Sequence, residues 1–223
     1  MLQPRCIARV SILLCCLLQA ADALAATIVV AVQTADGRPL AGAVITIHSL
    51  TGSDHPGVPV NAVMDQVNRA FVPDLVAITV GESVSFPNRD PFLHNVFSQS
   101  AARKFDLGSF KKDEQKSKDF PDPGVIDVYC NIHPEMAATI LVLPNRAHTR
   151  RNSDGSYVIA AVPPGTWTVF AYTRRVTKPV SATVTVVAGQ DAKVDLALVR
   201  GAEEQHLNKY GEKYHDTGTT TYH

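Results

Sequence analysis

The sequence predicts an all-β protein, in which a Greek-key sandwich or barrel is followed by a second, smaller β-sandwich. Short runs in which β-branched residues alternate with polar ones recur along the chain. Clusters of Gly, Pro, Asn and Asp separate these runs, as turns require. No apolar period of 3.6 residues persists for three helical turns. About eight short strands before residue 144 are typical of a Greek-key arrangement.

Residues 1–25 are predicted to be a secretory signal peptide. Arg5 and Arg9 precede the apolar run Val10–Leu18, and Ala23-Leu24-Ala25 supplies small residues for cleavage. The alternative is a retained membrane anchor, but the run is shorter than the roughly 20 apolar residues that a bilayer span needs. We therefore expect a periplasmic or secreted protein with no membrane span.

The first domain is expected to cover residues 26–144. Its middle stretch, Ala101–Asp119, is rich in lysine and has no clear pattern. These lysines indicate a solvated face, or alternatively a docking patch for an acidic redox partner. The strands are expected at Thr27–Gln33, Ala43–Leu50, Phe71–Val80, Ser83–Asn88, His94–Ser98, Val125–Cys130 and Ala138–Leu143.

The second domain is expected to cover residues 145–200, and its clean alternation indicates a sheet with one buried face. Residues 201–223 form a polar tail without a strand or helix pattern. We predict that this tail, which carries His206, Tyr210, Tyr214 and His215, is flexible; the alternative is that it docks a partner or binds metal. The strands of the second domain are expected at Ser156–Val162, Thr166–Tyr172, Val180–Val187 and Ala192–Val199.

The overall charge excludes one class of partner. Lys plus Arg and Asp plus Glu each number 21, so the formal net charge is zero. Binding to nucleic-acid phosphates leaves a basic excess, which this chain lacks, so we expect no nucleic-acid partner.

The residues that carry chemistry lie around one cysteine. Removal of the signal peptide leaves Cys130 as the only cysteine, so no intramolecular disulfide is possible. His133 and Met136 follow it with the spacing C-x2-H-x2-M, and His94 begins an earlier predicted strand. A thiolate, two imidazoles and a thioether form the His₂Cys site with an axial Met that is typical of electron-transfer copper. The alternative is a buried, inert cysteine.

The region 79–143 resembles the cupredoxin family, and within it the amicyanin and plastocyanin group. The segments VGESVSFPN, HNV and CNIHPEM carry this resemblance, and the gap from His133 to Met136 has the amicyanin length. The C-terminal domain resembles carboxypeptidase-regulatory-like domains of the transthyretin fold, through DGSYVIAAVPPGTWTVFAY. The whole mature chain resembles bacterial proteins labelled methylamine utilization proteins, which join these two domains.

The cupredoxin resemblance implies one copper per chain, held by His94, Cys130, His133 and Met136. It implies that Asn95 pins the ligand loop by hydrogen bonds. It further implies that His133 is the electron port, within an apolar ring for which Phe92, Leu93 and Pro134 are the candidates.

Two positions depart from the family pattern. Ile132 stands where the family has proline, so its N–H can donate a hydrogen bond to the Cys130 thiolate and raise the reduction potential. Glu135 places a charge near the expected port, which weakens the case for methylamine dehydrogenase as the partner.

The sequence therefore predicts an exported type 1 copper protein that carries single electrons between a donor and an acceptor redox protein. A dehydrogenase and a c-type cytochrome are the candidate partners. We expect no enzyme, because four protein ligands leave no open metal position for a substrate. The alternatives are a copper storage or delivery protein, and a carbohydrate- or protein-binding module whose copper half is non-functional.

Overall fold

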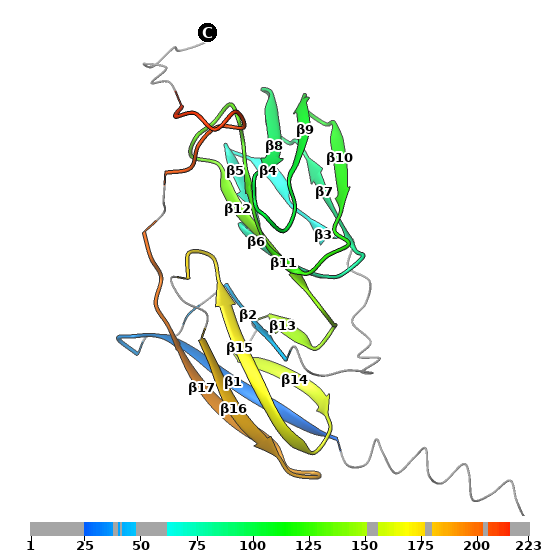
Figure 1. Cartoon of the computed structure of the whole chain (residues 1–223), viewed down its shortest axis with the longest axis vertical. Helices are drawn as coiled ribbons and strands as arrows, with labels where there is room; N and C mark the ends of the chain where they lie inside the picture. Colours follow the sequence, from blue (N-terminus) through cyan, green and yellow to red (C-terminus); the bar gives the residue numbers. More distant parts are fainter. Residues whose placement is uncertain are drawn as a thin grey trace, which may run out of the picture. The chain divides into compact units, whose positions relative to one another are not determined.

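The computed structural model describes residues 25–37, 40, 42–47, 62–150, 156–176, 180–202 and 205–214 (Figure 1). The predicted all-β fold is confirmed, since the secondary structure of these residues consists of strands and turns. The described part contains no helix with the length and apolarity that a membrane span requires. The predicted signal peptide, residues 1–25, lies outside the described residues except for Ala25.

The described chain divides into two compact units, each built from separate segments. One, the β8 unit, comprises residues 62–146, 173–176, 199–202 and 205–214. The other, the β1 unit, comprises residues 25–47, 147–172 and 180–198, with the gaps noted above.

The β8 unit contains a five-stranded sheet, a three-stranded sheet and a small hairpin. The five-stranded sheet has the order β6-β12-β11-β8-β9, and the three-stranded sheet has the order β10-β7-β3. Its strands are β3 (Ala62–Val63), β4 (Asp65–Val67), β5 (Ala70–Val72), β6 (Leu75–Thr79), β7 (Ser83–Pro87), β8 (His94–Ser98), β9 (Phe105–Phe110), β10 (Gln115–Asp119), β11 (Gly124–Tyr129) and β12 (Ala137–Leu143).

The two sheets of the β8 unit share one hydrophobic core. Val84 and Phe86 of β7 pack in the same buried cluster as Ile126 and Val128 of β11, and Cys130 and Met136 belong to it. Alternating side chains of each strand point to one face, so the apolar positions of both sheets meet in the core. The candidate metal ligands therefore stand at one end of a packed sandwich.

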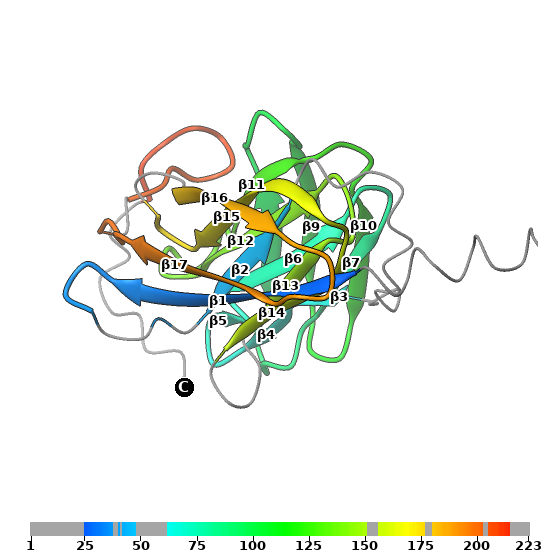
Figure 2. The same ribbon diagram turned by 90° about the horizontal axis from the view of Figure 1, so that it is seen from below.

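The β1 unit consists of two sheets, with the orders β14-β1-β17 and β13-β2-β15-β16 (Figure 2). Strand β1 pairs antiparallel with β14 and parallel with β17. The strands are β1 (Ala26–Thr34), β2 (Ala43–Thr46), β13 (His148–Arg150), β14 (Tyr157–Val162), β15 (Gly165–Thr173), β16 (Val180–Val186) and β17 (Ala192–Leu198).

The observed units differ from the predicted domains 26–144 and 145–200. Strands β1 and β2 come first in the chain, yet they pair with strands that come last. Ile28, Val30 and Val32 of β1 are buried. Without β1, strands β14 and β17 would each present an open hydrogen-bonding edge. The N-terminal strands thus complete the second sandwich rather than the first.

Candidate metal centre

Two elements of the β8 unit position the candidate ligands. His94 is the first residue of β8, and Cys130 directly follows β11. The loop from Cys130 to Met136 joins β11 to β12, whose pairing ends at Tyr129 opposite Ala137. Within the loop, the Cys130 N–H donates to the Met136 carbonyl at 3.3 Å, and the Met136 N–H donates to the His133 carbonyl at 3.1 Å. This closed hairpin turns two side chains back toward His94.

The predicted ligand atoms of His94, Cys130 and His133 converge. Among the described residues these three form a group whose ligand atoms all lie within 4.8 Å of one another. The Cys130 Sγ lies 3.9 Å from the His94 Nδ1 and 3.7 Å from the His133 Nδ1. The two Nδ1 atoms are 3.0 Å apart.

These separations fit a single metal ion. Bonds of about 2.0 Å to nitrogen and 2.3 Å to sulfur, at trigonal angles, place sulfur about 3.7 Å from each nitrogen. Both sulfur–nitrogen distances agree with this value, and the Nδ1–Nδ1 distance must widen by about half an ångström. One thiolate and two imidazoles are the soft, nitrogen-rich donors that suit copper.

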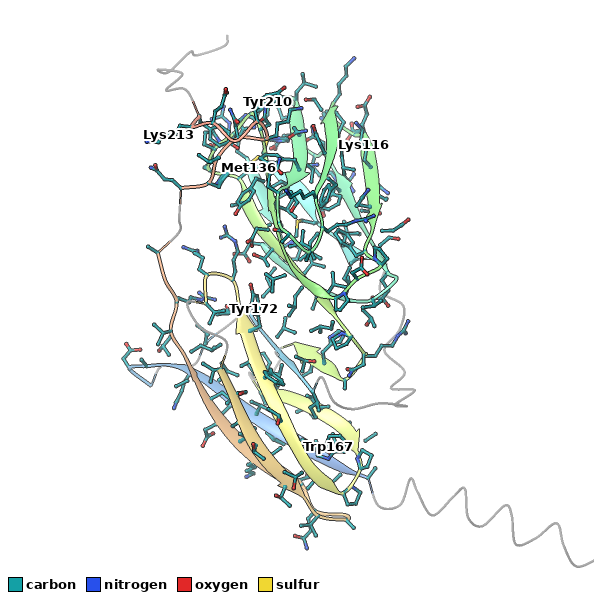
Figure 3. All side chains as sticks on the ribbon, viewed as in Figure 1. Lys116, Met136, Trp167, Tyr172, Tyr210 and Lys213 are labelled. Atoms are coloured by element: carbon teal, nitrogen blue, oxygen red, sulfur yellow. The ribbon has the colours of Figure 1, made fainter. Side chains whose placement is uncertain are left out.

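Met136, the predicted axial ligand, is fully buried and packs in the same core cluster as Cys130 (Figure 3). Its backbone is fixed by both hydrogen bonds that close the loop. The thioether therefore lies in a dry environment, close in the chain to Cys130 and His133. A weak thioether ligand suits such a position, because no water competes for the metal.

The outer nitrogen of His94 is held by a buried carboxylate. The His94 Nε2 lies 2.7 Å from the Asp90 Oδ2, and both residues are buried. The same carboxylate accepts the backbone N–H groups of Asn68 and Arg69, which form a turn with positive φ at both positions. Since Nε2 is engaged by Asp90, Nδ1 is the nitrogen that faces Cys130.

The charge of Asp90 is stabilised within the fold. Burial opposes ionisation, but the N–H of Arg69, the imidazole of His94 and the N–H of Asn68 together hold the pKa of the Asp90 carboxyl below its usual value. The sequence prediction did not include Asp90. Its spacing four residues before His94 within the segment RDPFLH was the available clue.

Asn95 and Ile132 occupy the positions expected of supporting residues. The Asn95 Oδ1 accepts the Asn131 N–H at 3.3 Å, and this bond joins β8 to the ligand loop. The Ile132 N–H lies 3.4 Å from the Cys130 Sγ, within the range of an N–H···S hydrogen bond. The first bond connects β8 to the ligand loop, and the second places a backbone N–H beside the thiol sulfur.

Burial has the largest effect on the pKa values of Cys130 and His133. It raises the pKa of the Cys130 thiol, and backbone N–H groups that include that of Ile132 act in the opposite direction. Burial, and then the neighbouring His94, lower the pKa of His133. His133 therefore favours the neutral form that binds metal, while the thiol needs a cation to lose its proton readily.

One edge of the site is covered by partly exposed apolar side chains. Phe92, Leu93 and Ile132 are exposed by 36%, 46% and 43%. The Phe92 ring lies against His133, with ring centroids 5.5 Å apart. Pro134 is exposed as well. His133 is thus the ligand nearest the surface, while His94, Cys130 and Met136 are fully buried.

Part of the C-terminal tail contacts the ligand loop, in contrast to the flexible tail that the sequence predicts. Residues 205–214 are described, and the Tyr214 hydroxyl donates to the Cys130 carbonyl at 2.8 Å. Its aromatic residues were the only clue in the sequence. His215 lies outside the described residues.

The fold and the site define an all-β protein with a candidate His–Cys–His–Met metal centre. Solved structures that resemble it include an amicyanin variant in its Cu(I) form, with 24% identity, a TM-score of 0.35, and alignment over 36% of this chain and 80% of that one. A reduced amicyanin variant has 25% identity and a TM-score of 0.35 over 39% of this chain and 87% of its own.

A further similar structure is the copper-containing nitrite reductase from Thermus scotoductus SA-01. It has 25% identity and a TM-score of 0.37, over 39% of this chain and 23% of the reductase. No protein-family model matches the sequence, and no curated protein matches it.

Proposed function

We propose that this protein is an exported type 1 copper protein that carries single electrons between redox partners. One observation carries the proposal: a buried thiol sulfur lies 3.7 and 3.9 Å from two imidazole nitrogens at the end of a β-sandwich. The resemblance of the ligand segments to cupredoxins supports it. The proposal of export depends on the predicted signal peptide.

Bound copper would supply a one-electron couple between Cu(I) and Cu(II). The protein residues hold the donors still during this change. His94 is fixed by Asp90, and Cys130 is fixed by the hydrogen bonds at both ends of its loop. Ligands that barely move keep the reorganisation small, and small reorganisation allows fast electron transfer.

The partly exposed His133 and the apolar side chains of Phe92 and Leu93 suit transient contact with another protein. We propose redox proteins as donor and acceptor, with a dehydrogenase and a c-type cytochrome as candidates. We also propose that the protein is no enzyme, because a metal with four protein ligands, Met136 included, keeps no position for a substrate.

The test is to load the mature protein with Cu(II) and to record visible absorption and EPR spectra. The proposal predicts one copper per chain, an intense thiolate-to-copper band, and reversible one-electron voltammetry. Both Cys130→Ala, which removes the donor, and Cys130→Ser, which replaces sulfur by oxygen, must lose the band. A protein that stays colourless with stoichiometric copper contradicts the proposal.

The alternative of copper storage or delivery is separated by the same sample. A delivery protein would bind Cu(I), exchange it rapidly with a chelator, and show no intense band. A binding module with a non-functional copper half would take up no stoichiometric copper. Either result would contradict the electron-transfer proposal and favour the corresponding alternative.

A further inference from the structure

The C-terminal segment 205–214 forms hydrogen bonds with Cys130 and Asn131 of the ligand loop (Figure 1, red). We name this segment the strap. It belongs to the β8 unit, although two segments of the β1 unit, residues 147–172 and 180–198, lie between it and the loop in sequence. The strap has no strand or helix, so its side chains and backbone groups, rather than sheet pairing, make its contacts.

The first set of contacts is a closed ring of hydrogen bonds. The Lys209 N–H donates to the Asn131 Oδ1 at 2.9 Å, and the Asn131 N–H donates to the Asn95 Oδ1. The Asn95 Nδ2 donates to the Asp106 Oδ1 at 2.7 Å, and the Lys209 Nζ donates to the Asp106 Oδ2 at 2.8 Å. The ring therefore joins β8, β9, the ligand loop and the strap.

Asp106 is a firm anchor for this ring. Its Oδ1 also accepts the Gly108 N–H at 2.8 Å, within β9. Burial opposes its ionisation, but Lys209, Asn95 and the Gly108 N–H hold the pKa of the Asp106 carboxyl below its usual value. A charged carboxylate with three partners fixes the lysine, and through it the strap, against β9.

The second set of contacts is aromatic. The His206 ring stacks on Tyr129, with centroids 3.9 Å apart and planes at 13°. The His206 Nε2 lies 3.1 Å from the Tyr214 hydroxyl, which donates to the Cys130 carbonyl. Since that hydroxyl donates to the carbonyl, it accepts from Nε2–H. The strap thus contacts the residue before Cys130, Cys130 itself, and the residue after it.

We propose that the strap is a positioning element that holds the Cys130 end of the metal site, with Tyr214 and Lys209 as its two points of attachment. The effect of the strap on metal binding rests on the proposed copper function, whereas its restraint of the loop needs no metal. The carbonyl of Cys130 faces the strap, while the Sγ faces His94. A backbone displaced at the carbonyl therefore carries the sulfur with it, and small displacements of a supported ligand weaken a metal site.

The test uses hydrogen–deuterium exchange of the backbone amides of residues 129–136 in the metal-free full-length protein. Tyr214→Phe removes the hydroxyl that bonds Cys130, and we expect exchange in this loop to become about fivefold faster, the effect of one lost hydrogen bond. Lys209→Met should give a similar increase. Lys213→Met is the matched control, since Lys213 is exposed on the same strap and should leave the loop unchanged.

A chain that ends at Ala202 should show a larger increase, about fiftyfold, confined to the loop and β8. A spread of fast exchange to β1 and β17 would mean general unfolding, and the two point variants then decide. If Tyr214→Phe and Lys209→Met both exchange like Lys213→Met, the proposal is overturned.

Copper-loaded protein gives a second, separate readout. We expect about fivefold faster loss of copper to a chelator in Tyr214→Phe than in the control Lys213→Met. If the protein binds no copper, the proposed function fails, but the exchange experiment on metal-free protein still decides whether the strap restrains the loop. If copper binds and both readouts match the control, the strap proposal alone is wrong.

Discussion

The two units bury different kinds of residue. In the described part of the β8 unit the buried polar or charged residues are Gln66, Asn88, Asp90, His94, Asn95, Ser98, Thr139, Thr173 and Asn208. In the described part of the β1 unit the corresponding residue is Thr46. The core of the β1 unit otherwise consists of apolar side chains and of Tyr157, whose hydroxyl donates to the Leu40 carbonyl.

This difference indicates that buried polar groups, which lower stability, are concentrated in the unit that holds the candidate metal centre. A buried polar group destabilises a fold unless it has hydrogen-bond partners. Asn88 is an example, since its Nδ2 donates to the carbonyls of Phe92 and Phe110 and its Oδ1 accepts the Asp90 N–H. These bonds order the segment that leads to His94. In the described part of the β1 unit the buried side chains are mainly apolar, so hydrophobic packing dominates its core.

The sharpest test of this comparison is a matched pair of core substitutions. Ile45 of β2 and Ile126 of β11 are both fully buried, one in each unit. Either change to alanine should lower the free energy of unfolding by about 2–5 kcal/mol through lost burial and a cavity. Only Ile126→Ala should speed copper loss, because Ile126 packs in the same cluster as Cys130 and Met136.

The chain offers a separate reporter for each unit. Trp167 of β15 is the single tryptophan, so its fluorescence follows the β1 unit during denaturant unfolding. The thiolate-to-copper band follows the β8 unit. If Ile45→Ala alters copper retention as much as Ile126→Ala does, the proposed division of roles is wrong.

The second prediction concerns the carboxylate behind His94. Asp90→Ala removes the acceptor of the His94 Nε2–H, so the ring loses its fixed orientation. We expect metal affinity to fall about 10–100-fold. Competition with a chelator of known affinity measures this change. Asp122→Ala, at an exposed position of the same unit, is the control, and equal affinities of the two variants would refute the role of Asp90.

A smaller effect is expected from the backbone donor to sulfur. Ile132→Pro removes the N–H that lies 3.4 Å from the Cys130 Sγ, and this bond favours the electron-rich reduced state. The reduction potential should fall by about 20–65 mV, the equivalent of one ordinary hydrogen bond. Voltammetry measures it. Ile132→Ala keeps the N–H and should leave the potential near that of the wild type; a shift as large as that of proline would exclude the mechanism.

The smallest effect concerns pH and the Asp106–Lys209 pair. The pKa of Asp106 in the folded protein lies below the ordinary value of 3.8. Its contribution to stability is therefore complete above about pH 3.8 and is lost as the pH falls through the lower, folded pKa. The stability difference between the wild type and Asp106→Asn should shrink on acidification below that pH. Denaturant titrations from pH 3 to pH 6 measure it.

Asp195→Asn, an exposed change in β17, serves as the control for this series. Its difference from the wild type should stay flat over the same pH range. A flat difference for Asp106→Asn as well would show that the ion pair contributes nothing to the fold.

The sequence predicts the ligand loop better than it predicts the units. Cys130, His133 and Met136 lie within seven residues, so a tight turn between two strands brings them together whatever the rest of the chain does. The partners of β1 lie more than 120 residues away in β14 and β17, and alternation along a strand does not say which strand it joins. The domain boundary was therefore misplaced at the N-terminal strands.

Two further features were not predictable from local pattern. The lysine-rich stretch after Ala101 forms strands β9 and β10. The Lys116 Nζ lies 5.0 Å from the centroid of the Phe110 ring and donates to the Leu107 carbonyl. Long lysines can cover an apolar surface while their charge stays outside, which hides a strand from a hydropathy pattern. The strap is likewise fixed by single side chains rather than by a repeating pattern.

X-ray absorption at the copper edge, recorded for the oxidised and the reduced forms of the full-length protein, shows whether one fixed set of donors holds the copper. We expect one sulfur and two nitrogen atoms bonded to copper in both forms, with little change in the bond lengths, because the β-strands, Asp90 and the loop hydrogen bonds fix the donors. Copper without a bonded sulfur, or a loss of a nitrogen on reduction, would contradict it.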